Sequence, residues 1–118
     1  MRLSEKQIIF SKNVASLIVY ADMIGIDLTF GDAFRNDFTQ KQYVKLGLSK
    51  TLNSLHRKRL AVDFNFFIDG KLTYDFNDIK ELGKFWLTLH PKNRWGGDFN
   101  KNSIQDGFVD TPHFEMQE

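Results

Sequence analysis

The stretch LAVDFNFFIDG, residues 60–70, decides the fold. Apolar side chains at positions 60, 62, 64 and 66 alternate with Ala61, Asp63 and Asn65. This period of two predicts a strand over 60–68 with one face in the core. The pair Asp69-Gly70 is a hairpin-turn signal, and residues 71–74 are suited to the returning strand. The centre of the chain is therefore predicted to be an antiparallel hairpin.

Helical periodicity flanks this hairpin on both sides. Residues 5–24 repeat apolar side chains at helical spacing behind a Ser4/Gln7 capping-box pattern, and Gly25 is the expected stop. A second helix is expected to begin at Asp75 or Asn77 and to end before Pro91. Its expected buried stripe is Ile79, Leu82, Phe85, Trp86 and Leu89.

The remaining segments predict short elements. A strand is expected over 26–30, a loop or helix start over 31–38, and a short helix over 40–46 that ends at Gly47. Residues 95–99 are typical of a loop, and 108–116 of an extended segment interrupted by Pro112. These elements together indicate an α+β fold, a small antiparallel sheet flanked by helices. We find no repeat or linker, so residues 1–118 are expected to form one domain.

Composition excludes several classes of function. The 118 residues carry 16 basic and 15 acidic side chains, a net charge of +1, so no basic field for nucleic acid is present. Cysteine is absent, which excludes a thiol nucleophile, a disulfide scaffold and cysteine-based metal sites. No apolar run reaches the ~18 residues of a membrane span, and no signal peptide is recognisable.

The chemistry-bearing residues begin with His56 and Asp63. Asp63 interrupts an apolar strand, where it is either a solvent-facing residue or a ligand. Seven residues separate it from His56, about 23 Å if extended and about 10 Å if helical. Both can contact one ion only if residues 57–60 reverse direction. The basic residues 57–59 are suited to an exposed reversal of this kind. Alternatively, they contribute to a cationic groove.

A second group lies near the C-terminus. A regular strand would direct Asp110 and His113 to opposite faces, but Pro112 breaks that regularity. His113 is either an ordinary hydrogen-bonded histidine or a ligand. Two histidines and one carboxylate are a common catalytic zinc set with an open fourth position. Asp110 is then suitably placed to act as general base.

The pattern Ser54-x-His56-(x)6-Asp63 with Asp110-x-x-His113-Phe114-Glu115 resembles the VanY-like and LAS-type peptidoglycan peptidases. The likeness extends over nearly the whole chain and is closest to the phage endolysin branch. Further segments occur in the family's order: the 7–25 helix, Phe34-Arg35, Gln40, Ser49-Lys50 and 95–99. The resemblance implies the fold shared by hedgehog and D-alanyl-D-alanine peptidases.

The same resemblance implies a role for each matching residue. His56, Asp63 and His113 would hold one Zn²⁺, and Asp110 would be the general base and acid. Arg35 resembles the arginine that faces the scissile carbonyl. Ser54 resembles the signature serine, which lies beside a ligand or the substrate. The family glycine between histidine and aspartate is Arg59 here, so we expect a different loop conformation at that point.

Two further residues have alternative interpretations. Trp95, in the glycine-containing loop, either lines the substrate cleft or covers the core. Asp98 either orients a metal-binding histidine through its second ring nitrogen or caps its own loop. His90, at a predicted helix end, is not expected to be a ligand.

The expected function is a zinc peptidase that cleaves an amide bond in the peptidoglycan stem peptide, specifically the L-alanyl-D-glutamate bond. Alternatives are a D-alanyl-D-alanine carboxypeptidase of the same fold and a non-catalytic wall-binding or virion structural module. The expected partner is the stem peptide, with no nucleic acid and no membrane insertion. Synthesis in the host cytoplasm, and release by a holin or within a virion, would follow from this interpretation.

Overall fold

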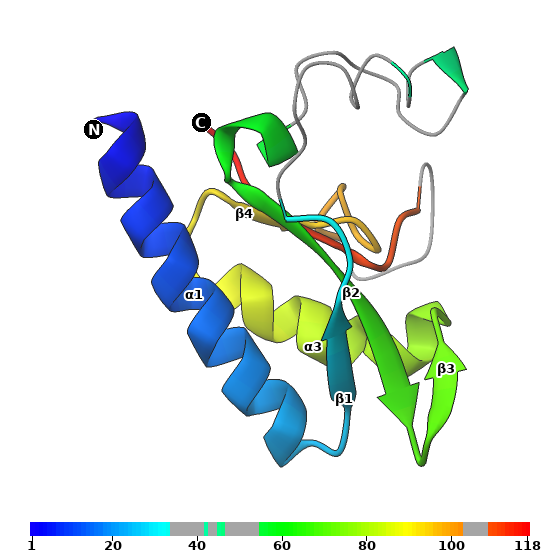
Figure 1. The fold of residues 1–118 in the computed structure, drawn as a ribbon. Coiled ribbons are helices and arrows are strands. Elements are labelled where there is room, and N and C mark those ends of the chain that lie inside the picture. Colours follow the sequence, from blue (N-terminus) through cyan, green and yellow to red (C-terminus); the bar gives the residue numbers. More distant parts are fainter. Residues whose placement is uncertain (34–41, 43–44, 47–54, 103–108) are drawn as a thin grey trace.

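The computed structural model describes residues 1–33, 42, 45–46, 55–102 and 109–118 (Figure 1). Its helices are α1 (Leu3–Met23), a short 3₁₀ helix (Leu55–Lys58) and α3 (Phe76–Leu89). Its strands are β1 (Asp27–Phe30), β2 (Ala61–Ile68), β3 (Lys71–Thr73), β4 (Asn93–Trp95) and β5 (His113–Met116). The predicted α+β class is confirmed, whereas most of the predicted 31–38 loop and 40–46 helix lies outside the described residues.

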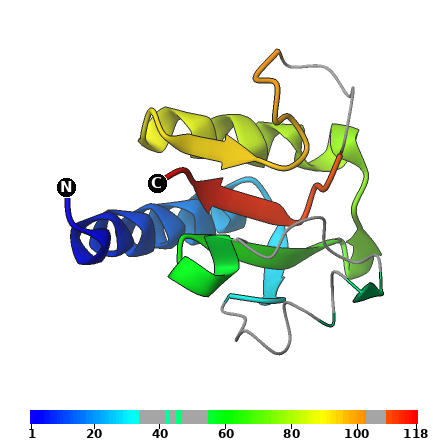
Figure 2. The ribbon, with the colours of Figure 1, turned by 90° about the horizontal axis from the view of Figure 1, so that it is seen from above.

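The strands form one antiparallel sheet in the order β1-β2-β5-β4, and β3 pairs with the far end of β2. Figure 2 shows this order from above, with α3 beyond β4. The β2–β3 hairpin turns at Asp69 and Gly70, whose φ angles are +52° and +78°. The hairpin predicted from residues 60–70 is therefore present, and β2 pairs with β1, β3 and β5.

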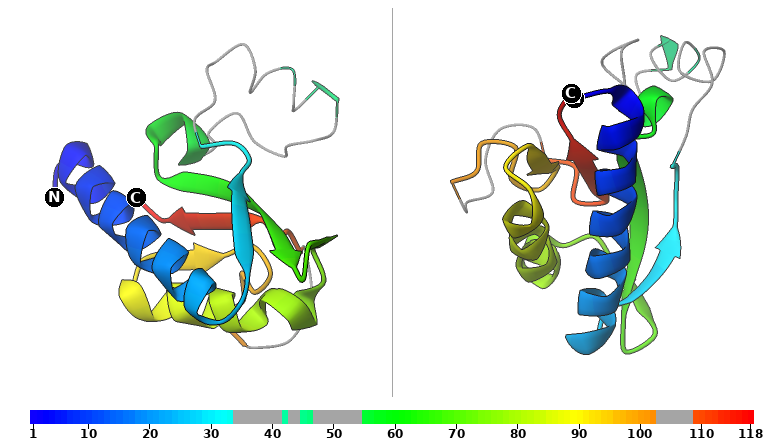
Figure 3. Two further views of the ribbon diagram at one scale, coloured as in Figure 1. Left: turned by 60° about the horizontal axis from the view of Figure 1, so that its bottom comes forward. Right: turned by 90° about the vertical axis from the view of Figure 1, so that its left-hand side faces the viewer.

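Both long helices cover the same face of the sheet, as the right-hand view of Figure 3 shows beside β1 and β2. The ring of Phe10 on α1 packs edge-on against the ring of Trp86, with ring centres 5.6 Å apart. Trp86 packs in the same way against Phe114 of β5, with ring centres 5.8 Å apart. Val62 and Phe64 of β2 are also buried there. Because this face is filled by aromatic and aliphatic side chains, the polar side chains of β2 and β5 are left on the other face.

The start of α1 differs from its prediction. The helix begins at Leu3, its N-cap is Arg2, and no side chain caps it, so the predicted Ser4/Gln7 capping box is wrong. Gln7 instead donates from Nε2 to the backbone oxygen of Lys58 at 2.7 Å. This contact fastens the first helix to the 3₁₀ segment that carries His56. Among the described residues, no helix combines the length and apolarity needed to cross a membrane.

The second helix follows its prediction closely. Asp75 is the N-cap of α3, and its Oδ1 accepts a hydrogen bond from the Asn77 backbone N–H at 2.8 Å. The chain after α3 differs, because residues 93–95 form strand β4 where a loop was predicted to begin at Trp95. The Trp86 indole N–H donates to the backbone oxygens of Arg94 and Glu115, both at 3.1 Å, and so ties α3 to β4 and β5.

Candidate metal centre

Strand register assembles the polar face of the sheet. The pairing of β2 with β5 sets Asp63 directly opposite His113, and the pairing of β4 with β5 sets Arg94 opposite Glu115. Because side chains alternate along a strand, these four residues lie on the face that the helices do not cover. A row of two acids, one histidine and one arginine therefore crosses three strands.

His56 reaches this row because the chain reverses just before β2. The 3₁₀ helix Leu55–Lys58 is followed by a hydrogen bond from Leu60 N–H to Leu55 O at 3.0 Å. Arg59 has a φ of +56°, so the backbone at this position is left-handed, although the arginine in place of glycine had suggested that it would not be. An arginine holds the left-handed backbone that glycine adopts freely, at a cost of about 1–2 kcal/mol. The reversal that a shared site requires is thus present.

His56, Asp63 and His113 meet in one cluster, with one ligand atom from each lying within 4.8 Å of the others. Asp63 Oδ1 is 3.4 Å from His56 Nε2 and 3.1 Å from His113 Nδ1. The two imidazole rings are 5.1 Å apart, centre to centre. The His56 side chain is 1% exposed, that of His113 12% and that of Asp63 21%. Such a group can hold a metal ion, and its access to solvent is on the Asp63 side.

Opposite charges dominate the electrostatics of the cluster. Burial alone would raise the pKa of the Asp63 carboxyl, but hydrogen bonds from His113 and His56 outweigh it and lower that pKa. Burial would lower the pKa of His113, yet its contacts with Asp63 and Glu115 raise it to about 9. The pKa of Glu115 is lowered, because His113 and Arg94 overcome the effect of its own burial. Both acids are therefore carboxylates at neutral pH, as metal binding and strong hydrogen bonding require.

Asp110 lies at the start of the turn that leads into His113. The His113 N–H donates to Asp110 O at 3.0 Å and closes this turn, so strand β5 begins only at His113. Gly96 makes backbone hydrogen bonds to both ends of this turn. Its N–H donates to His113 O at 2.7 Å, and its oxygen accepts from Asp110 N–H at 2.7 Å. A Cβ atom at Gly96 would lie 2.1 Å from Asp110 O and 3.0 Å from the His113 Cβ. Only glycine lets β4 approach this closely.

We therefore expect Gly96→Ala to displace Asp110 and His113 together. A forced contact of this kind typically costs about 1–3 kcal/mol of stability. It should also weaken metal binding at the three-residue cluster and slow any reaction that depends on it, because the backbone that positions both side chains has to shift. Thermal unfolding, metal titration and the activity assay described below, on the same preparation, check this expectation.

Gly70→Ala is the matched control for that variant. Gly70 has a φ of +78° and open space around the position of a Cβ, and it lies in the β2–β3 turn. Alanine there should cost about 1–2 kcal/mol of stability through the left-handed backbone alone and leave metal affinity and activity unchanged. If Gly96→Ala behaved like Gly70→Ala, losing stability but keeping activity, the backbone hydrogen bonds of Gly96 would have no functional role.

The other predicted site residues have different outcomes. Trp95 is 1% exposed, stacks on Phe76 with ring centres 5.5 Å apart, and donates its indole N–H to Thr111 O at 2.8 Å. Of its two interpretations the structure supports the core, and the cleft-lining one is wrong. Asp98 accepts a hydrogen bond from Asn102 N–H at 3.0 Å, a loop-cap contact. Arg35 and Ser54 lie outside the described residues.

The sequence interpretation missed Glu115. Its Oε1 lies 2.6 Å from His113 Nε2, the ring nitrogen on the far side from Asp63. For His113, a contact of the kind considered for Asp98 is made by Glu115. A local signal for it existed, because a residue two positions after His113 in a strand projects on the same face.

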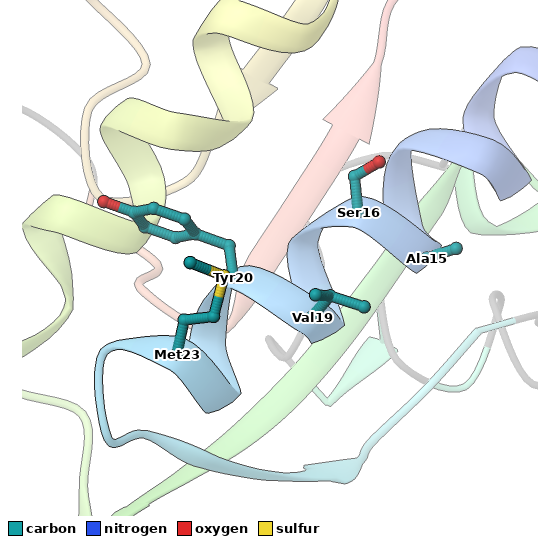
Figure 4. A pocket seen from close by; sticks show the side chains of 5 residues that line it. All are labelled: Ala15, Ser16, Val19, Tyr20 and Met23. Atoms are coloured by element: carbon teal, nitrogen blue, oxygen red, sulfur yellow. The ribbon is translucent and has the colours of Figure 1, made fainter.

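Two hollows in the described part of the chain lie apart from this cluster. The one in Figure 4 is about 340 Å³ and is lined by Ala15, Ser16, Val19, Tyr20 and Met23, all on α1. Figure 4 shows Tyr20 directed from α1 towards α3, where its ring stacks on Phe85 at 4.0 Å. A hollow of about 320 Å³ beside β1 and β2 is lined mainly by apolar side chains, together with Ser11 and Arg59. Neither contains one of the three clustered residues.

Comparison with known proteins agrees with this architecture. No curated protein matches the chain. The Serratia marcescens L-Ala D-Glu endopeptidase ChiX, known from a crystal structure, superposes with a TM-score of 0.67 at 20% identity, over 99% of this chain and 87% of that one. This likeness supports the fold, an LAS-type peptidase fold. The family model described as phage L-alanyl-D-glutamate peptidase matches residues 6–117, so the chain belongs to the phage L-alanyl-D-glutamate peptidase family.

Proposed function

We propose that this protein is a zinc-dependent endopeptidase that hydrolyses the amide bond between L-alanine and D-glutamate in peptidoglycan stem peptides. The observation that carries the proposal is the convergence of His56, Asp63 and His113, within 4.8 Å, in a member of this peptidase family. Its substrate would be the cell wall of a phage host, reached with the help of a holin or as part of a virion.

The donor set fits zinc. Two imidazole nitrogens and one carboxylate oxygen are the ligands of one common class of catalytic zinc site, which leaves a fourth position for water or substrate. When bound, the ion supplies Lewis acidity, which polarises a carbonyl oxygen and makes water a stronger acid. Magnesium and calcium prefer sites built from oxygen ligands alone, so the two histidines argue for zinc among the abundant cations.

Asp110 is proposed to move the proton. Hydrolysis joins a water oxygen to the amide carbon and breaks the bond from that carbon to the leaving nitrogen. The Asp110 carboxylate would accept the proton that water loses and then deliver it to the leaving amine, which departs neutral. Its place at the start of the turn that ends in His113 supports this role, since the short turn ties the base to a ligand.

Arg35 and Ser54 complete the proposed machinery by resemblance. An arginine that faces the scissile carbonyl would stabilise the negative charge that develops on its oxygen, an effect typically worth about 3 kcal/mol for one donor. A serine beside the first histidine would contact either that ligand or the stem peptide. Substitution of each by alanine, with zinc content measured beside cleavage, separates a substrate role from a metal-holding role.

Digestion of purified peptidoglycan tests the proposal directly. We expect mass spectrometry of the digest to find new N-terminal D-glutamyl peptides and L-alanyl muramic acid fragments. Cleavage should stop with a chelator and return with zinc. Release of a terminal D-alanine would instead indicate a carboxypeptidase of the same fold, and intact muropeptides beside a folded, zinc-loaded protein would indicate a wall-binding module.

A further inference from the structure

We propose that Glu115, held in place by Arg94, is a positioning residue that makes Nδ1 of His113 the metal-binding atom. The inference rests on the proposed zinc function and adds a part that the ligand set alone does not include. It assigns one role to two residues outside the three-residue cluster, and it specifies which of two ring nitrogens faces the ion.

The first step is the orientation of the His113 ring. Nδ1 faces Asp63 Oδ1 at 3.1 Å, on the side where His56 also lies. Nε2 faces Glu115 Oε1 at 2.6 Å. Both ring nitrogens face carboxylate oxygens, which only accept hydrogen bonds, but the contact of Nε2 is the shorter one. When the ring binds an ion as a neutral imidazole, Glu115 would therefore keep the proton on Nε2, and the lone pair on Nδ1 would face the ion that Asp63 shares. The hydrogen bond to Glu115 thus selects the tautomer that points its lone pair into the cluster.

The second step is the way in which Arg94 holds Glu115. Arg94 donates from Nε at 2.8 Å and from Nη2 at 2.6 Å, and both bonds go to Oε2. The other oxygen, Oε1, is the one that meets His113. The guanidinium also lies 5.1 Å above the ring of Phe99, which restricts its movement. Glu115 is 5% exposed, so its position depends on these partners more than on water.

The third step is that the backbone fixes the whole chain of contacts. Arg94 and Glu115 are directly opposed in the β4–β5 register, and Glu115 follows His113 by two positions on the same face. The Trp86 indole N–H binds the backbone oxygens of Arg94 and Glu115 from the opposite side of the sheet. A rigid frame of this kind is what an orienting contact needs, because a loosely held carboxylate would not select one ring orientation.

The wild-type protein gives the most direct test. In zinc-loaded protein, nitrogen-detected NMR of the histidine side chains should find the proton of His113 on Nε2 and the metal on Nδ1. Metal on Nε2 would overturn the proposal without any variant having to fold. A wild-type protein that binds no zinc would overturn both this inference and the proposed function.

Variants then measure the size of the effect. Loss of an orienting partner typically weakens metal binding by about 10- to 100-fold, so Glu115→Ala should raise the zinc dissociation constant by that factor in a chelator competition. Glu115→Gln keeps an oxygen that can accept from Nε2 and should lose less. Glu81→Gln, on the surface of α3 where Glu81 accepts from Tyr20 Oη at 3.1 Å, is the matched control and should bind zinc like the wild type.

A double-mutant cycle separates positioning from a merely structural ion pair. If Arg94 acts through Glu115, Arg94→Ala should weaken zinc binding in the wild type and have no further effect in the Glu115→Ala background. Equal effects in both backgrounds would remove Arg94 from the proposal. A folded Glu115→Ala protein with unchanged zinc affinity, from a chain whose wild type binds zinc and cleaves muropeptides, would overturn this inference alone.

Discussion

Replacement of His113 by alanine should abolish zinc binding and peptidoglycan cleavage together. His113 contributes one of the three clustered ligand atoms and contacts Asp63 at 3.1 Å. Its removal leaves two candidate ligands. It also removes a hydrogen-bond partner that stabilises the negative charge of Asp63. Loss of a residue that only orients a ligand typically weakens metal binding by about 10- to 100-fold. Loss of His113 should weaken zinc binding by more than this, because a ligand itself is removed. Equilibrium dialysis against buffered zinc and a turbidity assay on cell walls measure the two losses.

His90→Ala is the matched control for this variant. His90 caps the end of α3, and its Nδ1 accepts a hydrogen bond from Lys92 N–H at 3.1 Å, so it has a local structural contact of its own. Zinc content and cleavage should both survive its loss. Circular dichroism has to show that His113→Ala is folded. A folded His113→Ala protein that still bound zinc at wild-type affinity, or still lysed walls, would contradict the metal centre.

Sequence patterns predicted the parts of the fold that are encoded locally. The alternation over 60–68 predicted β2, and the polar side chain of Asp75 predicted the N-cap of α3, because each signal lies within a few residues of its consequence. Strand β4 is different, since three residues are too few to establish a period. Its place depends on long-range contacts, such as the Asn93 side-chain amide, which donates to Trp86 O at 3.0 Å.

The same distinction between local signals and long-range contacts applies to the residues of the candidate site. Residue types and the resemblance indicated His56, Asp63 and His113, but their convergence depends on a reversal at Arg59 and on the β2–β5 register. Neither the reversal nor the strand register can be derived from the sequence alone. Glu115 had a local signal, its spacing of two from His113, whereas Arg94 had none. Its contact with Glu115 exists only because β4 pairs with β5.

Asp110→Asn should give the opposite combination, a protein that keeps zinc and loses turnover. Asparagine has nearly the shape of aspartate, and the backbone contacts of this residue with Gly96 and His113 do not involve the side chain. The three-residue cluster should therefore stay intact. General acid–base catalysis contributes typically about 10²–10⁴-fold, so the turnover number should fall by that factor while the zinc dissociation constant is unchanged.

Asp69→Asn controls for the change of aspartate to asparagine. Asp69 lies in the β2–β3 turn with a φ of +52°, a conformation that asparagine tolerates, so activity and stability should both be retained. Steady-state cleavage of a defined stem peptide, with zinc content measured on the same sample, compares the two variants. Undiminished turnover in Asp110→Asn would exclude Asp110 as the proton carrier. Loss of zinc in parallel with activity would instead assign it to the metal site, because a pure acid–base residue changes the rate of the reaction and leaves the ion in place.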